Sequence, residues 1–278
     1  MLQELLLRAT EPENSQIAAP KTMLVFAHPD DETVGLGARL GRFAQACIVH
    51  VTDGAPRNEQ DSRGLGFRDY KEYGEAREGE LRQALRMAGL EKSERVSLQM
   101  PDQQASFNLP SLIRQIQALI STHRPEVIFT HPYEGGHPDH DACAFAVHTA
   151  VARVELEEGR APAILEAAFY HAGPHGIETE CFLPHAGAGE EICCELSTEE
   201  RYRKQRLLAC FPSQQETLRY FALEHECFRV APAYDFHERP HAGLLFYENF
   251  PWGMTSARFC ELAMEAEDTA KAEVGMCR

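Results

Sequence analysis

The sequence is poor in basic residues and has no long uninterrupted apolar run. Of its 278 residues, 27 are Lys or Arg and 43 are Asp or Glu, which gives a formal net charge of -16. Such an average field repels polyanions, so we expect no nucleic-acid partner. No apolar stretch approaches the ~20 residues that a membrane-spanning helix requires, and we therefore expect no membrane span.

The sequence also lacks the pattern of a secretory signal peptide and that of a disulfide framework. The short apolar run at 5–7 has no basic region before it and leads into acidic residues, which is unlike a signal peptide. The nine cysteines form no C-x-x-C pair, and the adjacent Cys193 and Cys194 are poorly placed to bridge each other. We therefore expect a cytoplasmic protein with reduced thiols, some of them in the core. The composition leaves a homo-oligomer open.

What the sequence does contain is an alternation of short apolar runs with longer amphipathic segments. Buried strands are expected at 22–28, 46–52, 96–100 and 127–130, and helices at 30–42, 69–90, 111–123 and 138–156. Four strand–helix alternations predict an α/β, Rossmann-like fold with a mostly parallel sheet and helices on both of its faces.

The later part of the chain is less regular. Strands are expected at 164–170 and 192–196, helices at 199–209 and 214–225, and loops with short strands over 228–253. We find no repeat, no low-complexity linker and no sharp change in composition. These observations favour one domain over residues 1–278, with a core at 22–225 and an irregular C-terminal part at 226–278.

The first motif with chemical meaning is AHPDDE at 27–32, directly after the first expected strand. Ligands gather at the carboxyl ends of strands in open parallel sheets, and imidazole and carboxylate are both zinc donors. His28 and Asp31 are three residues apart across a strand-to-helix turn, so both can face one metal ion. Asp30 can then lie beside the metal's water without binding the metal. The plainer interpretation, that these acids only cap the helix, leaves the His-Pro pair unexplained.

The second motif is HPDH at 137–140, which follows the fourth expected strand and a turn. It should open on the same edge of the sheet as the first motif, so His140 can supply a third metal ligand. His137 can face the substrate, and Asp139 can hold an imidazole in one tautomer. A single loop histidine is usually just solvated, but two such motifs after two strands of one sheet favour a metal site.

Together the paired motifs resemble those of the LmbE-like, or PIG-L, family. Its members are zinc-dependent deacetylases related to the N-acetylglucosaminyl-phosphatidylinositol de-N-acetylase and to the mycothiol-pathway deacetylase. The resemblance covers the Rossmann-like core at 22–225. It implies that one Zn²⁺ ion, or another divalent metal, is bound by His28, Asp31 and His140. It further implies that Asp30 is the general base. His137 would polarise the carbonyl or protonate the leaving amine, with Asp139 as its orienting partner.

Two further positions match the family less specifically. Arg77 begins REGEL at 77–81, which resembles the family's Arg-x-x-Glu-Leu stretch, where the arginine lies near the substrate. An exposed helix arginine that pairs along the surface explains it equally well. Asp102, after Pro101, resembles a family aspartate that can reach sugar hydroxyls, although a turn-forming role would also fit.

The chain departs from the family pattern in two places. Lys204 and Gln214 fit the spacing of a later family segment, but the histidine usual within that segment is Phe211 here. The mycothiol-pathway enzyme carries a tyrosine two places before the loop histidine, where this chain has Gly135. Tyr133 is close in sequence, so the oxyanion contacts can rest on Tyr133 or on the metal and His137 alone.

Three features imitate other sites. The glycines at 35, 37 and 41 resemble a dinucleotide-binding string, but they lie inside the expected helix, where close packing on the sheet is the better explanation. Asp53 resembles a ribose-binding acid, and without a glycine turn before it we interpret it as a turn residue. A Gly-rich loop carries a group of histidines that we expect to be exposed rather than at the rim of the site: His171, His175 and His185.

The leading functional hypothesis is a hydrolase that removes an acetyl group from a small N-acetylated sugar or sugar conjugate. Two alternatives remain: another metal-dependent amidohydrolase acting on a non-sugar amide, and a metal-free Rossmann-like module that binds nucleotide. No H-E-x-x-H helix is present for a metallopeptidase. Substrate identity depends on the loops at 55–68, 102–110, 171–190 and 228–253. Aromatic residues of the last loop can stack on a sugar or lipid, or belong to the core.

Overall fold

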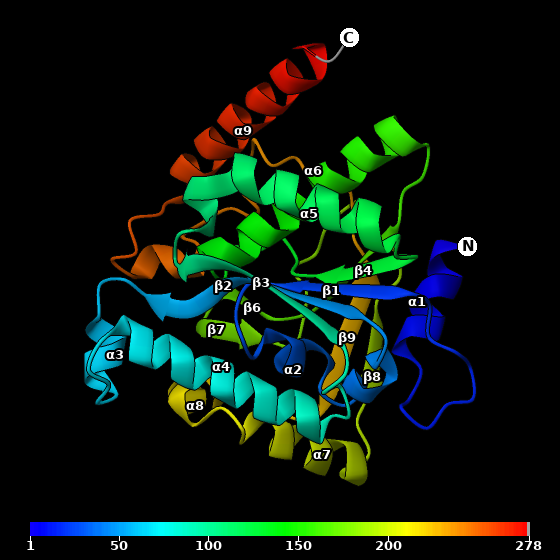
Figure 1. Ribbon diagram of the computed structural model, residues 1–278, viewed down its shortest axis with the longest axis vertical. Helices are drawn as coiled ribbons and strands as arrows, with labels where there is room; N and C mark the ends of the chain where they lie inside the picture. The colour runs from blue at the N-terminus through cyan, green and yellow to red at the C-terminus, as the bar shows by residue number, and fades with distance from the viewer. Residues whose placement is uncertain (277–278) are drawn as a thin grey trace.

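The computed structural model describes residues 1–276, which are built around a seven-stranded sheet (Figure 1). The strand order is β3-β2-β1-β4-β5-β9-β8. Strands β1 to β5 pair in parallel, whereas β9 is antiparallel to both β5 and β8. The mostly parallel α/β sheet expected from the sequence is therefore confirmed. The sheet strands are β1 (Thr22–Phe26), β2 (Cys47–Pro56), β3 (Glu94–Asp102), β4 (Val127–Thr130), β5 (Ala163–Ala167), β8 (Ile192–Glu195) and β9 (His225–Val230). A separate hairpin consists of β6 (Tyr170–Gly173) and β7 (Gly176–Thr179).

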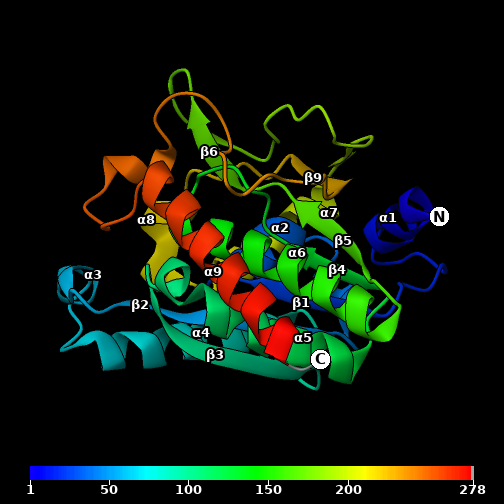
Figure 2. The ribbon, with the colours of Figure 1, turned by 90° about the horizontal axis from the view of Figure 1, so that it is seen from above.

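Helices cover both faces of this sheet. One layer holds α5, α6 and α9, and the other holds α2, α4, α7 and α8 (Figure 1). Figure 2 shows α9 running along α5 and α6. The helices are α1 (Leu2–Thr10), α2 (Asp31–Leu36), α3 (Gln60–Gly64), α4 (Tyr70–Met87), α5 (Leu109–His123), α6 (Pro138–Glu158), α7 (Thr198–Leu208), α8 (Gln215–Leu218) and α9 (Ser256–Met276). Single 3-10 turns are η1 (Leu40–Phe43), η2 (Ala105–Asn108), η3 (Pro212–Gln214) and η4 (Phe246–Asn249).

Strand β1 explains why both layers are needed. All five of its residues are buried. Met23 and Val25 pack in the cluster that contains α5, α6 and α9 side chains, while Leu24 and Phe26 pack with those of α2 and α4. Because successive strand side chains point to opposite faces, a strand without polar alternation must be covered on both sides.

Two expected helices are shorter in the structure. The helix expected at 30–42 stops at Leu36, because the next free N–H, that of Ala38, donates to Glu226 at 2.8 Å instead of to a helical carbonyl. The chain then continues as η1. The helix expected at 214–225 shrinks to α8, because the chain from His225 is drawn into the sheet as β9.

Two helix starts also differ from expectation. Helix α5 begins at Leu109, two residues before the expected start at 111, and Asn108 is at its N-cap. Pro110 at the first turn explains the earlier start, because its fixed backbone angle suits that position. Helix α1 was not expected, and it buries Leu6 and Ala9 against the sheet.

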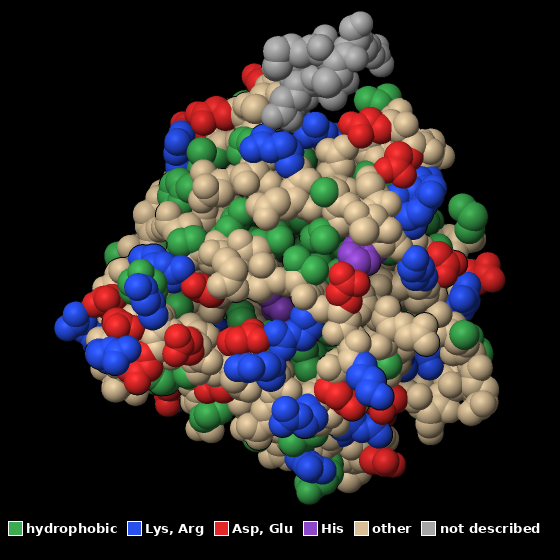
Figure 3. Space-filling model, viewed as in Figure 1, with side chains coloured by type: hydrophobic (Ala, Val, Ile, Leu, Met, Phe, Trp, Pro, Cys, Tyr) green, Lys and Arg blue, Asp and Glu red, His purple; other side chains and the backbone are tan. Residues whose placement is uncertain are grey.

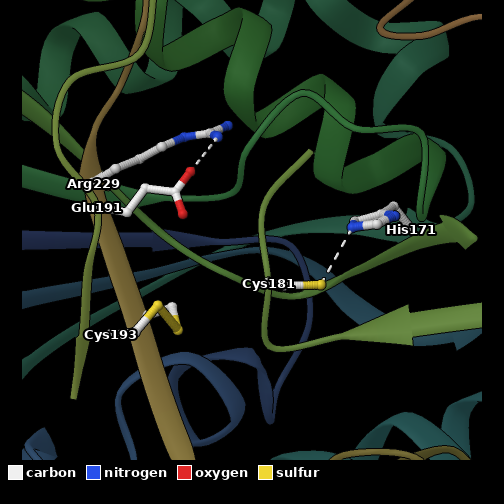
Figure 4. The surroundings of a disulfide bond; sticks show 6 residues. His171, Cys181, Glu191, Cys193 and Arg229 are labelled. Atoms are coloured by element: carbon white, nitrogen blue, oxygen red, sulfur yellow. Dashed lines mark hydrogen bonds and ion pairs between the residues drawn. A yellow bond between two sulfur atoms is a disulfide. The ribbon is translucent and has the colours of Figure 1, made fainter. Parts of the chain in front are cut away.

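A disulfide joins the two antiparallel strands at the edge of the sheet. Cys193 of β8 lies directly opposite Cys227 of β9, with Cα atoms 4.0 Å apart, and the two are bonded (Figure 4). The expectation of reduced thiols is wrong for this pair, because only the strand register reveals which cysteines face each other. The other described cysteines are free, and Cys277 lies outside the described residues.

Neither the helices nor the visible surface offers a membrane span or a broad basic patch. Within residues 1–276, no helix is both long and apolar enough to cross a bilayer. Figure 3 shows acidic and basic side chains interspersed on the face seen in Figure 1. The opposite charges on that face are mixed rather than segregated.

A buried cation holds the antiparallel end of the sheet to the loop after β4. Arg229 of β9 is 1% exposed and donates to Glu166 of β5 at 2.7 Å and to Glu134 at 3.2 Å. Burial raises the pKa of Glu166 to about 7 and that of Glu134 to about 8, while Arg229 opposes both shifts. Without this arginine, two carboxyl groups would be buried with no cation beside them.

We predict that Arg229→Leu destabilises the fold, and more so at alkaline pH. Breaking a buried pair of this kind costs about 3–5 kcal/mol. The folded-state pKa values of both carboxyls lie above their unfolded values, so their stabilising contribution is complete at low pH and is lost as pH rises through about 7 to 8. Losing Arg229 raises both folded-state values further, so the deficit of the variant grows over that window. Urea unfolding of both proteins at about pH 5.5 and about pH 8.5 measures this difference.

Arg258→Leu is the matched control, because Arg258 is an exposed arginine of α9 paired with Glu261. Its loss should change the free energy of unfolding by less than about 0.5 kcal/mol. A deficit in Arg229→Leu that stays constant with pH would contradict the assignment.

Candidate metal centre

Two strand ends bring the two His-Pro-Asp motifs together. His28 and Asp31 follow β1, and His137 and His140 open α6 after β4. Strands β1 and β4 are parallel neighbours, so their carboxyl ends lie at the same edge of the sheet. The chain order also reverses between these strands, and ligand crevices form at such switch points.

The metal-type donors of the two motifs lie within contact distance. Asp31 Oδ2 is 3.3 Å from His28 Nδ1, and Asp31 Oδ1 is 3.4 Å from His140 Nε2. Metal–ligand bonds of about 2.0–2.1 Å in tetrahedral geometry place neighbouring ligand atoms about 3.3 Å apart. The two distances run to different oxygens of Asp31, so the carboxylate lies between the two imidazoles, and all three residues are buried. Imidazole and carboxylate are both ligand types of a divalent metal such as zinc.

Three other donor sets overlap this one: His28 with His137 and His140, Asp31 with His131 and His140, and His28 with Asp102, His137 and Asp139. The last two include residues that are already engaged by backbone groups. His131, directly after β4, groups with Asp31 and His140, but its Nε2 already accepts the Ala27 N–H at 3.0 Å. Asp139 groups with His28, Asp102 and His137, but its two oxygens accept backbone N–H groups at 2.6 and 2.9 Å. These hydrogen bonds occupy the Nε2 lone pair of His131 and one lone pair on each oxygen of Asp139.

The far nitrogen of His28 is held by carboxylates. His28 Nε2 lies 3.1 Å from Asp102 Oδ1 and 3.4 Å from Asp139 Oδ2. A carboxylate on one ring nitrogen fixes the proton there and leaves the other nitrogen free to ligate. Burial alone would raise the pKa of Asp102, but the contact with His28 outweighs it and the pKa is lowered.

Asp30 has a strained backbone. Its φ is 130°, a value that side-chain-bearing residues rarely adopt, and such strain costs about 1–3 kcal/mol. Arg77 of α4 holds the turn by donating to Asp30 Oδ2 at 3.0 Å and to the Pro29 carbonyl at 2.7 Å. The Asp30 N–H donates to Glu32, which is itself buried against His50 at 2.9 Å. Strain held in place from both sides is typical of functional sites.

The same surroundings set the protonation of Asp30. Burial raises its pKa to about 8, and Arg77 opposes this shift. Arg77 is 3% exposed, so the interpretation of Arg77 as an exposed surface arginine is wrong. Its guanidinium also donates to the Gly54 carbonyl at 2.8 Å, which fixes its position under the Asp30 turn.

His137 presents a defined nitrogen to the site. Its Nδ1 accepts the Asp139 N–H at 3.1 Å as the N-cap of α6, so the neutral ring carries its proton on Nε2. Nε2 lies 3.7 Å from Asp102 Oδ1. The carboxylate of Asp139 is 3.9 Å from Nδ1, and its close contacts are the backbone N–H groups of Gln103 and Ala105.

A cavity of about 150 Å³ opens over these groups. Its lining includes all three candidate ligands together with Asp30, Arg77, Asp102 and His137. It also includes Tyr170, whose ring packs against His140, and Trp252, whose ring centroid is 4.7 Å from that of His137. Tyr170 was missed because it was expected as the last residue of a strand. His131 was missed as well, and its position directly after β4 was the signal that could have identified it.

The other positions that were compared with the family pattern make contacts within the fold. Lys204 is buried and pairs with Glu226 at 3.2 Å, and Phe211 lies in the core. Gln214 lines the cavity and donates to the Tyr73 hydroxyl at 2.6 Å. The Tyr133 hydroxyl donates to the Glu238 carbonyl at 2.9 Å and is not part of the cavity lining, so Tyr133 does not take the place of the family tyrosine. Gly135 has a φ of 70°, so a larger residue at this position would be strained, and its Cβ would lie 2.8 Å from the Leu245 side chain.

The three features that imitate other sites have different surroundings in the structure. A Cβ at Gly35 would lie 3.0 Å from Ala167 of β5, which confirms close packing as the reason for that glycine. Asp53 accepts a hydrogen bond from the Ala55 N–H and pairs with Arg57, as a turn residue does. His171 is buried, contrary to expectation, and lies 3.7 Å from Cys181 (Figure 4).

Comparisons with known proteins agree with this geometry. Residues 23–151 match the sequence model described as PIG-L: GlcNAc-PI de-N-acetylase. The 1D-myo-inositol 2-acetamido-2-deoxy-alpha-D-glucopyranoside deacetylase 1 of Saccharopolyspora erythraea is 30% identical over 167 residues, which cover 49% of this chain and 55% of that protein. The probable N-acetyl-alpha-D-glucosaminyl L-malate deacetylase 2 of Bacillus cereus is 30% identical over 141 residues, covering 49% of this chain and 63% of that protein.

Solved structures share the fold. The crystal structure of the A40926 pseudoaglycone deacetylase Dbv21 superimposes with a TM-score of 0.59 at 18% identity, covering 78% of this chain and 99% of that chain. The curated relatives are matched over only 55% and 63% of their own lengths. The segment matched by the PIG-L model contains both His-Pro-Asp motifs, so this part of the chain is similar to the PIG-L, or LmbE-like, family.

Proposed function

We propose that this protein is a metal-dependent hydrolase that removes the acetyl group from an N-acetylated sugar or sugar conjugate. The observation that carries the proposal is the buried carboxylate of Asp30, held in a strained turn beside a His-Asp-His donor set. A nucleotide-binding module would need neither the strained acid nor the donor set. The glycine packing at Gly35 also leaves no phosphate cradle there.

His28, Asp31 and His140 are the residues that would hold the ion, and we propose zinc. When bound, a divalent metal polarises an amide carbonyl and lowers the pKa of its water toward ~7. Asp102 would orient His28 through Nε2. The donor set is open on the side of the cavity, as a catalytic rather than a structural site requires.

Asp30 and His137 would move the protons. The Asp30 carboxylate takes the proton of the attacking water, and Arg77 positions it by two hydrogen bonds to the Asp30 turn. The His137 Nε2–H donates to the oxygen on which charge develops, a contribution of roughly 3–4 kcal/mol for one well-placed donor. A proton must then reach the leaving nitrogen from Asp30 or from His137.

The proposed substrate is an N-acetylglucosamine conjugate, as the names of the relatives indicate. A different amide in the same metal site is the second candidate, because the residues around the reacting atoms would serve either. Release of acetate from N-acetylated sugars, with and without chelator, separates the two. We further propose a cytoplasmic location, from the predominance of free thiols, and leave a homo-oligomer as a hypothesis for sizing experiments.

Asp30→Asn tests the base. The amide keeps the size of the side chain but cannot accept the proton, so kcat should fall by about 10²–10⁴-fold. Metal content by elemental analysis should stay at the wild-type value, since Asp30 is not a ligand. Asp53→Asn, an acid outside the cavity, is the control and should retain activity. Near-wild-type turnover of Asp30→Asn would refute the assignment.

His140→Ala tests the ligand set. Removing one of three protein ligands should lower the metal-to-protein ratio after dialysis, and acetate release should fall with it. His123→Ala, at the end of α5, is the matched histidine control. Unchanged stoichiometry in His140→Ala would exclude His140 as a ligand.

Asp102→Asn tests the orienting carboxylate. Loss of the charged acceptor on His28 Nε2 should weaken metal affinity by about 10–100-fold without abolishing binding. A chelator competition series against the wild-type protein measures this shift. Equal affinities would leave Asp102 with a role in substrate binding only.

A further inference from the structure

A second, larger cavity continues outward from the catalytic one. It measures about 590 Å³, against 150 Å³ for the inner cavity. The two share five lining residues, which places them end to end: Asp61, Tyr73, Gln214, Thr217 and Trp252. A substrate whose acetamido group reaches the donor set therefore has its remaining part in this outer groove.

One wall of the groove is aromatic. Phe250 and Trp252 stack with ring centroids 4.5 Å apart and an interplanar angle of 12°. Trp252 in turn touches His137, so the aromatic surface runs from the catalytic histidine outward. Phe250 is 38% exposed and is free to meet a ligand. Flat aromatic surfaces of this kind bind the apolar C–H face of a ring that also carries hydroxyls.

The facing wall is polar and carries no cation. It is formed by α3 and by the η3–α8 segment, with Gln60, Ser213, Gln214 and Thr217 supplying amide and hydroxyl groups. Neither lysine nor arginine lines this outer groove, whereas two carboxylates do, Asp61 and Glu216. Glu216 is paired with Arg219 at 2.8 Å. In the described part of the chain Asp61 makes no ion pair, and Arg77 of the inner cavity acts on it only at longer range, so Asp61 presents a negative charge to the groove.

We propose that this groove, lined by Phe250, Trp252, Asp61 and Gln214, is a second binding subsite for an uncharged, hydroxyl-bearing ring and that it discriminates against acidic aglycones. The inference rests on the proposed function, because the inner cavity must hold the N-acetyl sugar. A carboxylate in the groove meets Asp61 without a cation to pair with, and like charges brought together in this way lower affinity for the wrong ligand. A neutral polyol instead finds hydrogen-bond partners on one wall and an apolar surface on the other.

The test compares three substrates on the metal-loaded protein: N-acetylglucosamine, its α-glycoside with myo-inositol, and its α-glycoside with malate. The inositol conjugate should have a kcat/KM at least ~10-fold above that of the malate conjugate at low salt. The ratio should shrink as salt screens the groove. Equal values, or a preference for malate, would overturn the subsite. Hydrolysis of none of the three would instead refute the proposed function itself.

Two variants test which residues of the groove discriminate between the inositol and malate conjugates. Asp61→Asn should narrow the inositol-to-malate ratio, while Glu91→Gln, an exposed acid before β3 at the opposite edge of the sheet, should leave it unchanged. Phe250→Ala should raise KM for the inositol conjugate more than for N-acetylglucosamine alone, since only the conjugate reaches that ring. An unchanged ratio in Asp61→Asn, or equal effects of Phe250→Ala on both substrates, would contradict the assignment of this groove.

Discussion

The parallel pairing of β1 with β4 is the constraint on which the site depends. Thr22 pairs with Val127, and the two strands leave the sheet at the same edge, one leading into His28 and the other into the loop before His137. That loop passes so close to β6 that a Cβ at Gly136 would lie 2.1 Å from the Tyr170 carbonyl oxygen. Shifting either strand by one residue would turn its core side chains to the opposite face and separate the motifs.

A second layer of interactions holds the residues at these strand ends in place. The three proposed ligands are buried. The backbone N–H of His28 donates to Asp31 at 2.7 Å, and Asp102 holds the far ring nitrogen of His28 from outside the donor set. Arg77 supplies a fixed positive charge beneath Asp30. Rigid support of this kind is what the proposed hydrolysis would require of these side chains.

The sequence predicted the sheet, and it predicted that the two His-Pro-Asp motifs open on one edge of it, because both depend on local pattern. Apolar runs located β1 to β4, and the polar residues just after β1 and β4 located the site. The sequence could not predict how distant segments compete for the same backbone. Glu226 captures the Ala38 N–H and ends α2, and Cys227 meets Cys193 only through the register of β8 and β9. Likewise, Arg77 is buried because α4 packs on β2, which no helix periodicity reveals.

The strained turn at Asp30 has a consequence for how this protein can change over evolution. Glycine adopts a positive φ at no steric cost, but glycine at position 30 would leave the buried guanidinium of Arg77 without its carboxylate partner. Positions 30 and 77 are therefore linked: the aspartate should be lost only together with the arginine. A relative with glycine at the position of Asp30 should carry an uncharged residue at the position of Arg77.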